Sequence, residues 1–281
     1  MEIILAGTAG FCFGVKRAVS RVYEDLNTDN RIYTYGPIIH NDSVVNDLAA
    51  RGVEIINDRS ELGNVQGKLI IRSHGTTKEV IDYLEEQGID YEDMTCPFVK
   101  RIHNIVYERS NTDRIIIIGN AKHPEVVGIK GWCGNDSFVI ETHEEAEAFE
   151  ADRNCAYTIV SQTTFNHNKF KELVEIFTKK GYHVNVVNTI CDATKKRQEE
   201  AAVIASKVGC MIVVGDKKSS NSRKLYDICS EVCACCQFIE NAEELDLSAI
   251  PSTVESIGIT AGASTPNNII EEVQNYVRIN F

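Results

Sequence analysis

The sequence predicts an α/β fold of three lobes with small parallel sheets, related by pseudo-threefold symmetry around a common centre. Three features of the 281 residues indicate this fold: a pattern that recurs three times, short apolar strands that alternate with helical segments, and polar loops after the strands. Strands that alternate with helices pair in parallel and are covered on both faces, so they are apolar throughout. Ligand groups gather at the carboxyl ends of such strands, so the polar loops mark the expected functional centre.

Each repeat opens with a cysteine at or just before the start of a helix. These cysteines are Cys12, Cys96 and Cys191. The basic residues that follow them, among them Lys16, Arg17, Lys100 and Arg101, are interpreted as surface charge. Helical segments are expected after the cysteines at 18–26, 102–109 and 198–207. The lobes are predicted at 12–95, 96–190 and 191–281, with a strand in the N-terminal segment 1–11 joining the third lobe.

An apolar strand that ends at a glycine comes next in each repeat. The strands are expected at 31–35, 114–118 and 210–214. The glycines Gly36, Gly119 and Gly215 lie 24, 23 and 24 residues after their cysteines. Polar side chains stand four and six residues past each glycine: His40 and Asp42, His123 and Glu125, and Ser219 and Asn221.

A second apolar strand in each repeat runs into a small polar turn that opens another helix. These strands are expected at 68–72, 157–160 and 256–260, and the turns contain His74, Thr163 and Ser264. A glycine after a strand, or a cysteine near a helix start, is common in α/β proteins and means little alone. The same spacing in three places favours a functional interpretation of the cysteines and loops together.

Composition and charge exclude several classes of function. The net charge of −12 and a pI near 5.1 argue against a nucleic-acid or anionic-membrane partner. No apolar run approaches the roughly 20 residues of a spanning helix, and the N-terminal run is too short for a signal peptide. A cytoplasmic protein is therefore predicted, in which the ten cysteines are thiols or ligands rather than disulfides. The sequence has no dinucleotide fingerprint, phosphate-binding loop or nucleophile elbow, so electrons for any reduction must come from an external carrier.

Three thiolates that meet at one point can bind zinc with a further ligand, or a cubane iron–sulfur cluster with one iron left open as a Lewis acid. Residue types alone leave both possibilities open. The surrounding imidazoles, hydroxyls and amides, with helix N-termini, suit a diphosphate, and Glu125 is the best candidate for proton delivery. These polar residues are His40, His74, His123, Thr163, Ser219, Ser220, Asn221 and Ser264.

A rival motif lies near the C-terminus. Cys229, Cys233 and Cys236 have the C-x3-C-x2-C spacing of radical S-adenosylmethionine enzymes. We discount this interpretation because the barrel that normally follows the motif has no room after it, and because Cys235 stands where an aromatic residue is usual. A chain with ten cysteines also produces such spacings through its composition.

The motifs together resemble the 4-hydroxy-3-methylbut-2-enyl diphosphate reductase family, also called IspH or LytB, over the whole chain. The segments that carry the resemblance are 9–16 (AGFCFGVK), 39–41 (IHN), 73–75 (SHG), 95–97 (TCP), 123–125 (HPE), 161–164 (SQTT), 219–222 (SSNS) and 261–264 (AGAS). The resemblance implies a two-electron, two-proton removal of the substrate hydroxyl. The products are isopentenyl and dimethylallyl diphosphates, and the reaction is the final step of the non-mevalonate pathway.

The resemblance also implies roles for the residues. Cys12, Cys96 and Cys191 would hold a [4Fe–4S] cluster in which one iron is not ligated by protein and takes the substrate hydroxyl. Glu125, Thr163 and His123 would relay the proton, and a ferredoxin or flavodoxin would supply electrons. A hydro-lyase of the aconitase type and a zinc-bearing or cluster-bearing regulatory protein remain alternatives. The residues expected to hold the substrate are His40, His74, His123, Thr163, Ser219, Ser220, Asn221 and Ser264.

Overall fold

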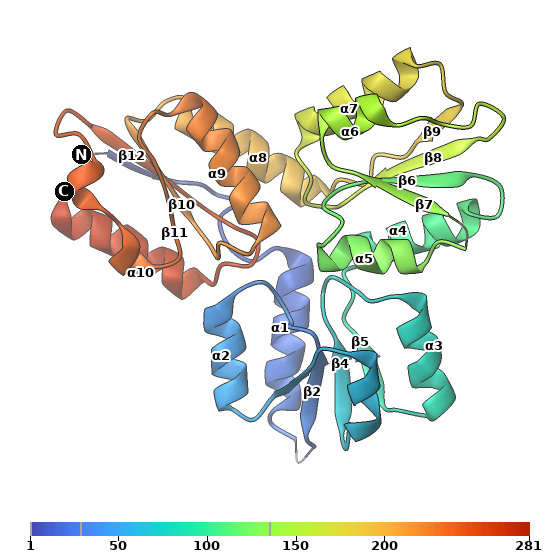
Figure 1. Ribbon diagram of the computed structural model, residues 1–281. Helices are drawn as coiled ribbons and strands as arrows, with labels where there is room; N and C mark the ends of the chain where they lie inside the picture. Colours follow the sequence, from blue (N-terminus) through green and yellow to red (C-terminus); the bar gives the residue numbers. More distant parts are fainter. Residues whose placement is uncertain (1, 29, 135) are drawn as a thin grey trace. The chain divides into compact units, whose positions relative to one another are not determined.

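The computed structural model describes residues 2–28, 30–134 and 136–281, which form three four-stranded parallel sheets with helices (Figure 1). The α/β fold with three small parallel sheets is thus confirmed. The chain divides into two compact units. Unit 1 comprises Met1–Lys16, Ile39–Asp47 and Asp192–Phe281, and unit 2 comprises Arg17–Ile38 and Leu48–Cys191.

Unit 1 contains one sheet with the strand order β1-β12-β10-β11. Its strands are β1 (Glu2–Leu5), β12 (Ser256–Ala261), β10 (Cys210–Val214) and β11 (Cys236–Ile239). Its helices are α8 (Asp192–Ala205), α9 (Ser220–Val232), η2 (Ala242–Glu244), η3 (Leu247–Ala249) and α10 (Asn267–Asn280).

Unit 2 contains the other two sheets, with the orders β3-β2-β4-β5 and β7-β6-β8-β9. The first has β3 (Glu54–Ile56), β2 (Ile32–Tyr35), β4 (Lys68–Ile71) and β5 (Tyr91–Asp93), with η1 (Arg59–Asn64) and α3 (Lys78–Gln87). The second has β7 (Ser137–Ile140), β6 (Arg114–Ile118), β8 (Tyr157–Ser161) and β9 (Val184–Val186), with α4 (Pro97–Arg109), α5 (Pro124–Gly131), α6 (His143–Ala148) and α7 (His167–Lys179). The chain passes between the units within α1 (Phe13–Asp25) and α2 (Asp42–Ala50).

All three sheets share one strand order. In unit 2 the second strand along the chain lies at one edge, followed by the first, the third and the fourth. The sheet of unit 1 has the same order when β1 is taken as its fourth strand, because β1 pairs with β12 in parallel. The strands in this fourth position are β5, β9 and β1, and Cys96, Cys191 and Cys12 follow them.

Alternation of side chains places helices on both faces of the central strands. In unit 1, Ile212 and Ile259 pack against α10, whereas Met211 and Val213 pack against α8 and α9. In the β6 sheet the same alternation separates a cluster with α6 and α7 from a cluster with α4 and α5. The central strands are therefore largely apolar and buried on both faces, which is why the sequence identifies them.

The structure extends the prediction in two respects. The helices after the cysteines begin at Phe13, Pro97 and Asp192, about one and a half turns before the predicted starts. Each sheet also has short strands that the sequence does not reveal: β3, β5, β7, β9 and β11. These strands have three or four residues and are mostly half-buried, so they lack the apolar run that marks a central strand. No helix within the described ranges combines the length and apolar character that a membrane span needs.

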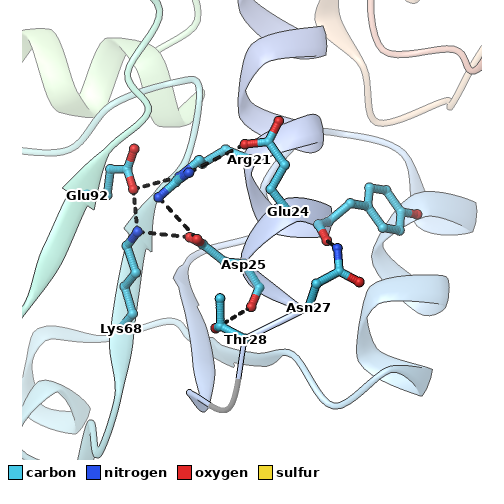
Figure 2. Close-up of polar contacts among 8 residues, drawn as sticks. Arg21, Glu24, Asp25, Asn27, Thr28, Lys68 and Glu92 are labelled. Atoms are coloured by element: carbon cyan, nitrogen blue, oxygen red, sulfur yellow. Dashed lines mark hydrogen bonds and ion pairs between the residues drawn. The ribbon is translucent and has the colours of Figure 1, made fainter.

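An ion-pair network ties α1 to the β2 sheet in unit 2 (Figure 2). Lys68 on β4 contacts Asp25 at 3.0 Å between Nζ and Oδ2, and it also pairs with Glu92 on β5. Arg21 lies between the same two carboxylates, at 3.1 Å from Asp25 and 2.8 Å from Glu92. The Asp25 side chain is only 8% exposed, so the network neutralises a carboxylate that would otherwise be costly to bury.

We expect Lys68→Met to lower the free energy of unfolding by roughly 1–3 kcal/mol, because it leaves the largely buried Asp25 with one fewer cation. The shift would be measured by denaturant titration. Lys179→Met is the matched control, since Lys179 pairs with Glu175 on the exposed face of α7 and such pairs contribute little. An equal loss in both variants would show that the network is no stronger than an ordinary surface pair.

Candidate functional site

The three cysteines have the same backbone environment. The amide of Cys96 donates to the carbonyl of Ser73 at 2.9 Å, and the amide of Cys191 donates to that of Thr163 at 3.1 Å. The amide of Cys12 donates to the carbonyl of Ala263 at 3.3 Å. Each acceptor lies two residues past the third strand of the same sheet, namely β4, β8 and β12. Every cysteine is therefore held at the carboxyl ends of two neighbouring strands, where the polar loop also begins.

Each cysteine directly precedes a helix. Phe13, Pro97 and Asp192 are the first residues of α1, α4 and α8, and Cys96 is the N-cap of α4. All three cysteines are partly exposed and form no disulfide. A helix N-terminus stabilises a thiolate, the form that binds metal.

Unit 2 brings His74 and His123 together. Their ring centroids lie 5.5 Å apart in an edge-to-face arrangement. His123 is the N-cap of α5, and its Nδ1 accepts a hydrogen bond from the amide of Glu125 at 3.2 Å. Because Nδ1 is an acceptor, the proton of the neutral His123 ring lies on Nε2, from which it can be donated to an anion.

Glu125 is buried beside Thr163. Its side chain accepts two hydrogen bonds from Thr163, one from the amide at 2.6 Å and one from the hydroxyl at 2.7 Å. Burial raises the pKa of Glu125 to about 7, and the two hydrogen bonds, which lower the pKa, offset only part of that rise. A carboxyl group with this pKa can give up or take a proton near neutral pH, as a general acid must. The Thr163 carbonyl also accepts from the amide of Cys191, so the Glu125–Thr163 pair lies next to a cysteine of the same unit.

Unit 1 gathers the serine and amide residues at the N-terminus of α9. Ser219 is the N-cap of α9, and the hydroxyl of Ser264 donates to the Ser219 hydroxyl at 3.4 Å. Asn221 is 4% exposed, and within the described residues neither polar atom of its side chain has a hydrogen-bond partner. A buried amide without partners is costly, so the Asn221 side chain has a donor and an acceptor to offer to a ligand.

His40 belongs to the 39–47 segment of unit 1 and is half-buried. The amide of Asp42, two residues later, donates to Asp216 at 3.0 Å. The Asp42 carboxylate pairs with Lys218 at 2.6 Å. These contacts anchor the segment that carries His40 to the loop that leads into Ser219.

The packing of Ser222 explains why glycine occupies positions 215 and 262 in unit 1. The Ser222 side chain is fully buried and touches the backbone of Gly215 and Gly262, so closely that a Cβ on either glycine would overlap its hydroxyl. This packing brings the first turn of α9 against the ends of β10 and β12, where Ser219 and Ser264 lie.

Gly262→Ala is expected to lower the free energy of unfolding by roughly 1–3 kcal/mol, because the new methyl group overlaps Ser222. Adding Ser222→Ala should recover much of this loss, since it removes the overlapping hydroxyl. Thermal unfolding of the two single variants and the double variant measures the coupling. Strictly additive effects would contradict the contact as the cause.

Two of the basic residues after the cysteines are not surface charges, contrary to the prediction for that group. Arg197 is 4% exposed, and its guanidinium donates to the carbonyls of Gly10 at 2.8 Å and Ala261 at 3.1 Å. It thereby connects α8 to the loops that carry Cys12 and Ser264.

Arg17 is partly buried and donates to the carbonyl of Thr95, next to Cys96. Lys16 and Lys100 are exposed, as predicted. The sequence offers no signal that separates these arginines from the neighbouring lysines.

The comparisons with known proteins agree with this geometry. The family model described as LytB protein matches residues 3–278. The chain belongs to the LytB family. Among its relatives is a 4-hydroxy-3-methylbut-2-enyl diphosphate reductase of Thermoanaerobacter sp. (strain X514), 44% identical over 99% of this chain and 97% of the relative. A Clostridioides difficile (strain 630) protein of the same name is 42% identical over 99% of each chain.

Solved structures lead to the same LytB family. The structure described as E-1-hydroxy-2-methyl-but-2-enyl-4-diphosphate reductase from Plasmodium falciparum superposes with a TM-score of 0.90 at 29% identity. That match covers 99% of this chain and 87% of the other. A second structure, described as (E)-4-hydroxy-3-methyl-but-2-enyl diphosphate reductase, has a TM-score of 0.67 at 39% identity and covers 99% of this chain and 100% of the other.

Proposed function

We propose that this LytB-family chain is a 4-hydroxy-3-methylbut-2-enyl diphosphate reductase of the non-mevalonate pathway. The names of its full-length relatives support this activity. The net reaction adds two electrons and two protons to the allylic alcohol, expels the hydroxyl as water, and leaves isopentenyl or dimethylallyl diphosphate. The observation within this chain that carries the proposal is the buried Glu125 carboxyl, which has a pKa of about 7 and is hydrogen-bonded to Thr163 beside a cysteine.

Glu125 is proposed as the acid that protonates the departing hydroxyl. Hydroxide is a poor leaving group at neutral pH, whereas water leaves easily. The Thr163 hydroxyl, 2.7 Å from Glu125, is the group through which the proton passes toward the substrate. His123 holds the first turn of α5 through Nδ1, so its Nε2 can donate to the substrate while the ring stays fixed.

The diphosphate is proposed to bind to the hydroxyl, amide and imidazole groups of the polar loops. The N-terminus of α9 offers amide donors, and the unsatisfied Asn221 side chain adds a donor and an acceptor. Hydroxyls and neutral rings can bind an anion without a cluster of lysines, which fits the acidic composition. The complete proposed set is His40, His74, His123, Thr163, Ser219, Ser220, Asn221 and Ser264.

The LytB family consists of iron–sulfur enzymes, and this chain has cysteines suited to a cluster. We propose that Cys12, Cys96 and Cys191, one from each of the lobes 12–95, 96–190 and 191–281, hold a [4Fe–4S] cluster with one iron free of protein ligands. Their fit rests on partial exposure, the lack of disulfides and the position before a helix start. Bound there, the cluster would supply electron transfer and a Lewis-acid iron.

The electrons are proposed to come from a ferredoxin or flavodoxin in the cytoplasm. The chain has no nicotinamide-binding fingerprint, so an external carrier fits the reaction. None of the ten cysteines, all of which lie within the described ranges, forms a disulfide, which fits a reducing compartment.

Turnover of the hydroxymethylbutenyl diphosphate by the iron-reconstituted protein, measured anaerobically with and without a chemical reductant, tests the function. We expect both isoprenoid diphosphates to form only when the reductant is present. Conversion of substrate without reductant would instead indicate a hydro-lyase. Ligand binding by a loaded cluster with no conversion would indicate a regulatory protein.

Asn221→Ala should raise KM roughly 10–150-fold and change kcat less, because a lost hydrogen bond to a charged ligand costs about 1.5–3 kcal/mol. Steady-state kinetics under saturating reductant measures both constants. Asn280→Ala is a matched control, since Asn280 lies in the exposed last turn of α10. An unchanged KM in the Asn221 variant would remove Asn221 from the substrate-binding set.

A further inference from the structure

Five cysteines of unit 1 take no part in the site described above. Cys210 begins β10, Cys229 and Cys233 lie at the C-terminal end of α9, and Cys235 and Cys236 lie at the start of β11. Met211 and Cys236 are register partners on neighbouring strands, so Cys210 and Cys235, one residue earlier, also lie opposite each other. The amide of Met211 donates to the carbonyl of Cys235 at 2.8 Å, which fixes this register.

The pleat of the sheet separates these cysteines into two sets, because successive side chains point to opposite faces. Cys210 and Cys235 lie on the face covered by α10. Cys229, Cys233 and Cys236 lie on the face covered by α8 and α9. On that second face the Cys233 thiol donates to the carbonyl of Cys235 at 3.1 Å, and the Cys229 thiol points to the carbonyl of Ala201. The three cysteines with the C-x3-C-x2-C spacing therefore pack against α8 and α9. Cys210 and Cys235 on the α10 face do not form such a motif.

Cys210 and Cys235 pack in the same apolar cluster on the α10 face, on neighbouring paired strands. Neighbouring strands lie about 4.7–4.9 Å apart, within the range of about 4.4–6.8 Å between the Cα atoms of a disulfide. The spacing of the two strands is therefore compatible with a disulfide between these opposed residues.

The two thiols differ in accessibility. Cys210 is fully buried, whereas Cys235 is partly exposed. Cys235 lines a pocket of about 530 Å³, together with Gly209, Ala249, Pro251, Val254 and Ser256. The pocket lies at the amino ends of β10 and β12. Gly215 and the loop that carries Ser219 lie at the opposite end of the sheet, where the strands have their carboxyl ends. Burial raises the pKa of Cys210, so Cys210 is a protonated thiol behind the accessible Cys235.

We propose that Cys210 and Cys235 form a second redox site, a dithiol that exchanges with small disulfides such as oxidised glutathione. The Cys235 sulfur attacks one sulfur of the small disulfide, forms a mixed disulfide and releases one small thiol. The Cys210 sulfur then attacks the Cys235 sulfur, forms the protein disulfide and releases the second small thiol. The protons of the two cysteines pass to the two released thiolates. The protein is oxidised by two electrons, and the small disulfide is reduced to two thiols.

Treatment of the full-length, cluster-loaded protein with oxidised glutathione under anaerobic conditions tests this proposal. The remaining thiols are alkylated, and tryptic peptides are mapped by mass spectrometry. Trypsin cleaves between Cys210 and Cys235 at Lys217 and Arg223, so a link joins two peptides, and fragmentation assigns the sulfur atoms. We expect a Cys210–Cys235 link in the unmodified protein and a stable glutathione adduct on Cys235 in Cys210→Ser.

Cys233→Ser is the matched control, because Cys233 is two residues from Cys235 but faces the other side of the sheet. We expect this variant to form the link as the unmodified protein does, and Cys235→Ser to form neither link nor adduct at this pair. A disulfide from Cys235 to Cys233 or Cys236, or no adduct on Cys235 in the Cys210→Ser protein, would overturn the proposal.

Discussion

Glu125→Gln is expected to bind the diphosphate substrate almost unchanged but to reduce it roughly 10²–10⁴-fold more slowly, the usual contribution of a positioned general acid. Glutamine keeps the size of the side chain, and its one oxygen can still accept from the Thr163 amide, but it has no acidic proton to give. Steady-state kinetics with saturating reductant would show the loss in kcat rather than in KM. Glu172→Gln, on the exposed face of α7, should leave both constants unchanged. Turnover at the normal rate in Glu125→Gln would mean that another group supplies the proton.

Glu125 should also make the free energy of unfolding depend on pH. The pKa of Glu125 is about 7 in the folded protein and near 4.5 when unfolded, so between these values the folded state binds more protons. The free energy of unfolding therefore falls as pH rises from about 4.5 to 7, by up to roughly 3 kcal/mol from this group. In the Glu125→Gln variant this contribution to the pH dependence of the free energy of unfolding should be absent. The variant should therefore be more stable than the unmodified protein at pH 8. Thermal unfolding at pH 5 and pH 8 measures the difference, and parallel shifts in the two proteins would contradict the raised pKa.

Replacing any one of Cys12, Cys96 and Cys191 by serine is expected to abolish stable cluster binding, with loss of visible iron–sulfur absorption and of activity. A cubane cluster left with two thiolates is poorly held, because serine is a weak substitute for a soft thiolate ligand. Absorption spectra and iron content of anaerobically reconstituted variants measure the effect.

Cysteines of the C-x3-C-x2-C motif provide matched controls for this experiment. Cys229 and Cys233 are buried against α8 and α9, and Cys236 is on the same face, so their serine variants should retain the absorption. Loss of absorption in Cys233→Ser with retention in Cys96→Ser would reverse the assignment. Binding of zinc in place of iron by the unmodified protein would favour the regulatory alternative.

The repeat is the part of this protein that the sequence reveals most fully. The central strands of each sheet are buried on both faces, so they form largely apolar runs, the first ending at a glycine and the second at a polar turn. The cysteines and polar turns stand at fixed spacings from these strands, and the spacings predicted His74, His123, Glu125 and Thr163 as site residues. The structure places these four together within unit 2. Local patterns are sufficient to predict these four residues, because each lobe repeats the same short order of strands, loops and helices.

Other features depend on contacts between residues far apart in the sequence, and only the tertiary structure decides them. The N-terminal strand is predicted to join the third lobe, but its place in the sheet depends on strands some 200 residues later. β1 pairs in parallel with β12 as the fourth strand, and no local pattern encodes that neighbour or its register. Burial gives Glu125 its raised pKa and distinguishes Arg197 from the exposed lysines, and strand register places Cys210 opposite Cys235. The sequence by itself determined which residue types recur and at what spacing. Solvent exclusion and strand register exist only in the folded chain. They decided which of those residues are buried, which have shifted pKa values and which are in contact.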